Sequence, residues 1–242
     1  MKTWRDVARF HLVVWWAPLL MPWAILACSF VVNLVIFAVS PDGQRQVPTS
    51  HGLVSVPDPG YTGGVASIYV MFIVLGVNMI GRSFPFALSL GVSRRSYYAG
   101  SAALGLALAA VDGLALTALQ AIERGTDGWG VGMHFFRVPY ILSGPWYQTW
   151  LTSLAALALL FVYGMWYGIV YRRWSLPGVV SFVIAQLAVV VAVVLLAAGA
   201  DAWAGVGRFF TGLTAVGLTG LMVALAVLLL AGGHATIRRA TV

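Results

Sequence analysis

The chain has 242 residues, of which 61% are hydrophobic and only 9% are charged. A soluble domain keeps about a quarter of its residues charged, so this composition excludes an ordinary water-soluble protein. The formal net charge is +7, but the few basic residues flank long apolar runs, which argues against nucleic-acid binding.

Six apolar runs predict an all-α integral membrane protein with one transmembrane domain over 1–242. In chain order the predicted spans are 13–39, 65–81, 99–121, 149–171, 177–199 and 209–231. Runs of roughly 18 or more apolar residues are typical of transmembrane helices. The first run exceeds the 7–15 residues of a signal-peptide core, so we expect it to be retained.

The segments between the spans differ in length. Residues 1–12 mix aromatic and basic side chains. They fit either a short interfacial N-terminal helix or an ordinary basic flank. Two large outer loops are expected at 40–64 and 122–148, and the loops after the fourth and fifth spans are much shorter.

The basic residues predict that both termini are cytoplasmic. Short cytoplasmic loops carry an excess of Lys and Arg. With the N-terminus inside, the cytoplasmic segments hold Lys2, Arg5, Arg9, Arg82, Arg94, Arg95, Arg172, Arg173, Arg238 and Arg239. The outer segments hold only Arg45, Arg124, Arg137 and Arg208.

The break between the second and third spans, residues 82–98, carries its own helix signals. Ser83 can cap a helix, Pro85 suits a first turn, and Gly91 can end the helix in the left-handed conformation. Ser93 offers a second cap for the third span. We expect a two-turn helix along the cytoplasmic surface. It is either a topogenic loop with a buried apolar face or a docking surface for a partner.

This stretch, with the six-span layout, resembles the permease subunit of type-2 ABC exporters. The matching residues are Phe84-Pro85-Phe86, then Leu90-Gly91-Val92-Ser93-Arg94-Arg95, then Tyr97-Tyr98. The resemblance covers essentially the whole chain in layout. It implies a multi-pass exporter subunit of the bacterial cytoplasmic membrane, with residues 82–98 as the coupling helix region that docks on an ATPase subunit.

The resemblance also implies partners and site residues. The ATPase-coupling surface would consist of Arg82, Phe84, Pro85, Phe86, Leu88 and Leu90, with Arg94 and Arg95 at its edge. The expected partners are an ATP-binding cassette subunit, a second permease that is identical or diverged, and membrane lipid. Larger family members place a partly re-entrant element between spans 5 and 6, for which residues 200–208 are expected to be too short.

The chain carries no sequence signal for catalysis. A P-loop requires a lysine in G-x-x-x-x-G-K-[ST], and the only lysine is Lys2. ATP and Mg²⁺ are therefore expected in the partner ATPase, with no cofactor or metal in this chain. The predicted topology also separates the four histidines. An alternative function with the same topology is a non-transporting scaffold or sensor accessory.

Polar residues inside the spans are the remaining candidates. Asp112, Asn33 and Gln186 interrupt apolar runs, and Tyr163 and Tyr167 share a face of the fourth span. They fit either a translocation path or a network of internal hydrogen bonds between helices. On an adjacent face, Gly164 and Gly168 form a small-xxx-small pair, which allows close helix approach.

Overall fold

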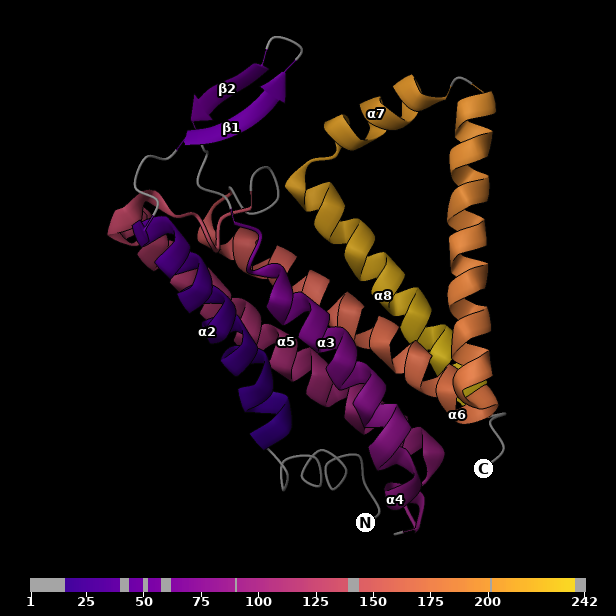
Figure 1. The fold of residues 1–242 in the computed structure, drawn as a ribbon. Coiled ribbons are helices and arrows are strands. Elements are labelled where there is room, and N and C mark those ends of the chain that lie inside the picture. The colour runs from indigo at the N-terminus through magenta and orange to yellow at the C-terminus, as the bar shows by residue number, and fades with distance from the viewer. Residues whose placement is uncertain are drawn as a thin grey trace.

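A computed structural model describes residues 16–39, 44–49, 52–57, 62–89, 91–138, 144–200 and 202–237. The predicted interfacial helix at 1–12 lies outside this part. The elements are helices apart from one strand pair (Figure 1). They are α2 Trp16–Val39, β1 Gln44–Thr49, β2 Gly52–Pro57, α3 Ala66–Asn78, η1 Met79–Ser83, α4 Phe84–Ser89, α5 Arg94–Gly125, η2 Gly128–Gly132, α6 Trp146–Gly199, α7 Trp203–Gly212 and α8 Ala215–Ile237.

Five helices in the described part are long and apolar enough to cross a membrane: α2, α3 with its continuation to Ser89, α5, α6 and α8. This agrees with the expected helical membrane protein. The 54-residue α6 is divided at Ser175, where φ is 56° and ψ is −155°. A helix cannot run through that conformation, and Pro177 follows it closely. The two resulting arms, 146–174 and 176–199, include the predicted segments 149–171 and 177–199.

The second span does not end at Gly81 as the sequence predicts. It continues through the π-helical turn η1 into α4. Pro85 explains the wide turn, because proline has no N–H to donate and its ring collides with the carbonyl of Gly81 in a regular α-helix. Ser83 lies inside η1, so the expected cap of a separate surface helix is wrong.

The turn between α4 and α5 follows the prediction. Gly91 has a φ of +79°, and Ser93 accepts a hydrogen bond from the backbone N–H of Ser96 at 3.2 Å. Glycine tolerates the left-handed conformation without a steric cost. The third span accordingly begins at Arg94.

The two long loops that the sequence predicts outside the membrane are more structured than expected. β1 and β2 form an antiparallel hairpin within the predicted loop 40–64. In the second predicted loop, Met133, Phe135 and Phe136 are buried and belong to the core. The last span begins at Ala215 rather than at residue 209, and α7 lies between α6 and α8. A ten-residue helix therefore stands where the sequence predicted only a short loop at 200–208.

Glycines bring α3 and the first arm of α6 into backbone contact. A Cβ at Gly76 would collide with the carbonyl oxygen of Phe161, and one at Gly164 with the carbonyl oxygen of Ile73. A Cβ at Gly168 would collide with the Cβ of Ile80 in η1. The close approach predicted for the glycine pair of α6 is confirmed. The core forms around this contact, with α5 as the third helix.

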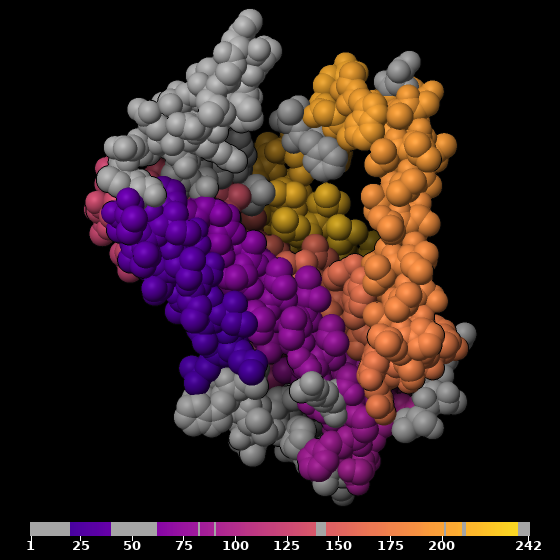
Figure 2. All heavy atoms as spheres, viewed as in Figure 1, coloured from indigo at the N-terminus to yellow at the C-terminus, as the bar shows by residue number. Residues whose placement is uncertain are grey.

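The second arm of α6, with α7 and α8, packs much less tightly. Figure 2 shows this arm in orange, standing apart from the α2–α3 side of the molecule. Its side chains are mostly exposed, as for Leu195 at 64%, and Leu228 of α8 is 67% exposed. Exposed aliphatic side chains on long helices suit contact with lipid or another apolar helix.

Candidate docking and translocation sites

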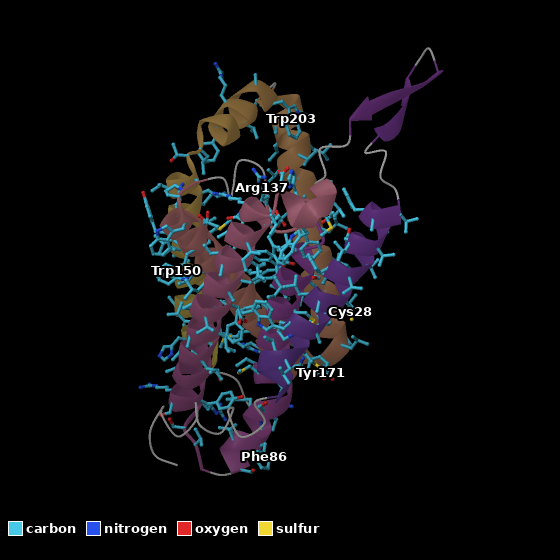
Figure 3. All side chains as sticks on the ribbon, turned by 90° about the vertical axis from the view of Figure 1, so that its left-hand side faces the viewer. Cys28, Phe86, Arg137, Trp150, Tyr171 and Trp203 are labelled. Atoms are coloured by element: carbon cyan, nitrogen blue, oxygen red, sulfur yellow. The ribbon has the colours of Figure 1, made fainter. Side chains whose placement is uncertain are left out.

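Helix α4 lies at the end of the molecule where α2 begins and α8 ends, while the hairpin and α7 lie at the opposite end (Figure 1). Phe86 extends from this end, and Trp203 and Arg137 lie toward the other (Figure 3). The Phe86 side chain is 55% exposed. An aromatic side chain this exposed at the tip of a membrane protein can contact a soluble partner.

Two buried residues of α4 itself fix this helix to the core. Phe84 is 4% exposed and its ring centroid lies 5.2 Å from that of Tyr97 on α5. Ala87 is also buried, and its carbonyl accepts the Val92 N–H at 3.2 Å. The short helix therefore has a buried face on the protein and an exposed face at the tip.

Tyr97 also links α5 to the π turn. Its hydroxyl donates a hydrogen bond to the Met79 carbonyl oxygen at the start of η1. A π turn displaces the regular i→i−4 ladder, and a buried carbonyl without a partner is costly. The tyrosine supplies a partner from the neighbouring helix, so η1 and the start of α5 are held together.

The predicted coupling residues do not all share one surface. Phe86 and Arg95 are exposed, and Pro85, Leu88 and Arg94 are half-buried. Phe84 is buried, so it does not contribute to an exposed docking surface, contrary to expectation. Its ring is needed in the contact with Tyr97. Leu90 lies outside the described residues, as does the side chain of Arg82.

Three of the predicted path residues meet between the two arms of α6, beside a groove lined by two of them. The hydroxyls of Tyr163 and Tyr167 lie 2.9 Å and 2.7 Å from Gln186 Oε1, and 3.0 Å from each other. The adjoining groove has a volume of about 690 Å³ and includes Phe182. Because the tyrosines belong to the first arm and Gln186 to the second, this cluster joins the two arms within an apolar surrounding.

The other two predicted path residues lie elsewhere. Asn33 donates from Nδ2 to the Ser29 carbonyl of its own helix at 2.8 Å. Asp112 is 2% exposed, and its Oδ1 accepts from the indole N–H of Trp23 on α2 at 3.0 Å. This bond joins two helices, as the internal-network interpretation of Asp112 requires. The five candidates therefore do not form one polar path in this structure.

Glu123 is a buried acid that the sequence interpretation missed. One carboxylate oxygen, Oε2, accepts the backbone N–H groups of Phe135 and Phe136, each at 2.9 Å, and the indole N–H of Trp129 at 3.1 Å. We placed Glu123 in an outer loop because it follows the apolar run. Its eleven-residue separation from Asp112 was the available signal, since it places both acids on one helix face.

No metal site is found in the described part of the chain, where no group of three His, Cys, Asp or Glu residues could hold an ion. Comparison with protein-family models, curated proteins and solved structures finds no match to this chain. Function is therefore inferred from the geometry of the residues themselves.

Proposed function

We propose that this chain is the membrane-spanning permease subunit of a bacterial ATP-binding-cassette exporter. In this proposal it crosses the cytoplasmic membrane six times, counting each arm of α6, with both termini inside. The observation that carries the proposal is the construction of α4. An exposed Phe86 stands at the tip of the molecule, on a helix whose other face is fixed to two membrane helices.

The connections of α4 suit the transmission of a displacement from a bound partner to the membrane-spanning helices. It is continuous with α3 through η1, and it joins α5 through the Gly91 turn and the contact between Phe84 and Tyr97. Because α3 is in backbone contact with α6 at Gly76, a displacement of α4 reaches the groove between the arms of α6. The polar cluster of Tyr163, Tyr167 and Gln186 would then line the path that opens and closes.

The cassette subunit supplies what this chain lacks. ATP and Mg²⁺ bind to that partner, and its closure on ATP moves α4. A second permease, identical or diverged, completes the transport unit. The exposed aliphatic surfaces of α6 and α8 provide apolar area for this second chain and for lipid.

The test is the substitution Phe86→Asp in the full chain co-expressed with its cassette ATPase. A charge at the centre of an apolar contact is strongly unfavourable, so we expect co-purification and stimulated ATPase activity to fall by about tenfold or more. The matched control is Trp203→Asp, because Trp203 is 51% exposed and lies at the opposite end. This variant should retain both co-purification and stimulated ATPase activity.

Equal effects of the two substitutions, or no effect of Phe86→Asp, would contradict docking through α4. Transport into inverted vesicles separates a permease from the alternative of a scaffold or sensor accessory. A chain that stimulates the ATPase without moving any substrate across the vesicle membrane would support the alternative.

A further inference from the structure

A second pocket lies away from the groove of α6, between α2, α5 and the segment 126–138. Its volume is about 250 Å³. Its lining is aromatic and aliphatic and includes Trp23 and Phe30 of α2, Leu119 of α5, and Trp129 and Phe136 beyond the end of α5. Sites for drug-sized ligands have about 300–1,000 Å³, so this pocket suits a smaller molecule.

The aromatic rings at the pocket are fixed by contacts with one another. The ring centroid of Phe30 lies 4.9 Å from that of Trp129, at an interplanar angle of 71°, and 6.0 Å from that of Phe136. The faces of such rings carry partial negative charge and attract cations. A ring that turns its face to the pocket makes an apolar wall electrostatically favourable to a positive group.

Two buried carboxylates outside the lining accept hydrogen bonds from tryptophans of the pocket. Trp23 donates its indole N–H to Asp112 Oδ1, and Trp129 donates its own to Glu123 Oε2. The acids are 2% and 0% exposed. The second oxygen of each, Asp112 Oδ2 and Glu123 Oε1, has no hydrogen-bond partner in the described part of the chain.

Such an arrangement favours a positive ligand for two reasons. A buried carboxylate with an unpartnered oxygen is costly, and a nearby cation reduces that cost. Each acid is one hydrogen bond away from a tryptophan of the lining, so a charge on its carboxylate acts on the pocket through surroundings of low dielectric constant. The lining itself is apolar, and it selects a cation whose body is hydrophobic.

We propose that this pocket binds a small hydrophobic organic cation, a substituted ammonium with an aryl or branched alkyl body. Asp112 and Glu123 supply the complementary charge, and the rings of Trp23, Phe30 and Trp129 surround the ligand. Ala27, an exposed lining residue of α2, marks the side open to the surroundings. Because α2 lies at the edge of the helix group (Figure 1), the ligand enters from the lipid. This inference does not depend on the proposed exporter function.

The test measures binding of radiolabelled phenyltrimethylammonium to the full chain in phosphatidylcholine nanodiscs, by equilibrium dialysis against empty nanodiscs. No ATPase subunit is needed, so failure here is distinguishable from failure of the docking proposal. We expect saturable binding to one site per chain. The neutral isostere tert-butylbenzene should displace it about tenfold less well or worse, because the isostere lacks the charge.

Three variants locate the site. Asp112→Asn keeps the shape and the acceptor for Trp23 but removes the charge, and should weaken binding by about tenfold or more. Ala27→Trp fills the pocket from an exposed position and should abolish binding. Asp127→Asn is the control, because Asp127 is an exposed acid only four residues from Glu123. It should bind like the unmodified chain.

Absence of saturable binding, equal displacement by tert-butylbenzene, or unchanged affinity in Asp112→Asn would overturn the proposal. Size-exclusion elution reports whether Asp112→Asn still assembles. If it does not, Ala27→Trp and the neutral competitor decide the question. Unchanged binding in a folded Ala27→Trp variant would exclude this pocket as the site.

Discussion

At the scale of single residues, Glu123 fixes the segment that follows α5. Three N–H donors from Trp129, Phe135 and Phe136 reach one of its oxygens, so one side chain holds the chain that follows α5. The backbone of this segment is strained at two positions. Asp127 and Trp129 have positive φ angles of 48° and 62°, a conformation that costs non-glycine residues roughly 1–2 kcal/mol each.

We expect Glu123→Gln to loosen this segment. Hydrogen bonds to a charged group contribute about 1.5–3 kcal/mol and those between neutral groups about 0.5–1.5 kcal/mol. The free energy of opening should therefore fall by about 1–3 kcal/mol. Hydrogen exchange at the Phe135 and Phe136 amides measures the change, which should be an acceleration of about fivefold or more.

Asp127→Asn serves as the control for this measurement as well. Asparagine tolerates the left-handed conformation, and Asp127 is exposed. Exchange at the two phenylalanine amides should stay unchanged in this variant. Equal protection in Glu123→Gln and the unmodified chain would mean that the burial of the two rings alone holds the segment.

At the scale of elements, the glycine contact between α3 and α6 fixes the position of the central helices. Gly76 and Gly81 lie one and a half turns apart, yet their surroundings differ. A Cβ at Gly76 would meet the Phe161 backbone, whereas nothing lies within 4 Å of a Cβ at Gly81. The pair therefore separates the effect of helix packing from the effect of adding a methyl group.

Gly76→Ala should destabilise the protein by about 1–3 kcal/mol, because backbone atoms cannot move aside as a flexible side chain can. Gly81→Ala should be neutral or stabilising by up to about 1 kcal/mol, since alanine has the higher helix propensity. Unfolding midpoints of the two variants in the same detergent provide the comparison. A lower midpoint for Gly81→Ala than for Gly76→Ala would contradict the packing described for α3.

Hydrophobic periodicity, together with capping and helix-breaking residues, predicted the helices well where the signal came from residues close in sequence. The Gly91 turn, the Ser93 cap and the break near Pro177 depend on neighbouring residues, and each was found in the structure. The continuation of α3 into α4 was missed. A π turn absorbs the missing donor of Pro85, and no sequence pattern distinguishes that outcome from a helix end.

The candidate site residues were predictable as a set of polar groups, but not as neighbours. Asp112 and Gln186 both stood out because they interrupt apolar runs. Trp23, the partner of Asp112, lies on another helix, and the tyrosine partners of Gln186 lie on the other arm of α6. Only tertiary packing selects these partners. The aromatic residues of 126–138 were interpreted as part of an outer loop because interfacial anchoring and burial predict the same composition.

At the scale of the whole molecule, the long helices run between two opposite ends of the structure. Helix α4 lies at one end, and η2 follows α5 at the other (Figure 1). The distribution of Lys and Arg predicts that the α4 end is cytoplasmic. This orientation can be tested directly, because the chain has a single cysteine, Cys28.

In a Cys28→Ala background, we expect Asp127→Cys to react with an impermeant maleimide on intact spheroplasts. Arg95→Cys should react only after the membrane is opened. Both positions are exposed in the folded chain, so a difference in labelling reports the side of the membrane and not burial. The reverse pattern would place α4 outside and would also exclude docking of an intracellular ATPase on Phe86.

The contact between α3 and α6 has a consequence for how the protein is made. Gly76 touches residues around Gly164, so close partners are separated by almost ninety residues of chain. During synthesis, α3 enters the membrane with its glycine face uncovered and stays so until the first arm of α6 follows. A ribosome that stalls after α5 would leave this face available to chaperones, insertion machinery or proteases. Quality control of the nascent chain should therefore act most strongly in the interval before α6 is inserted.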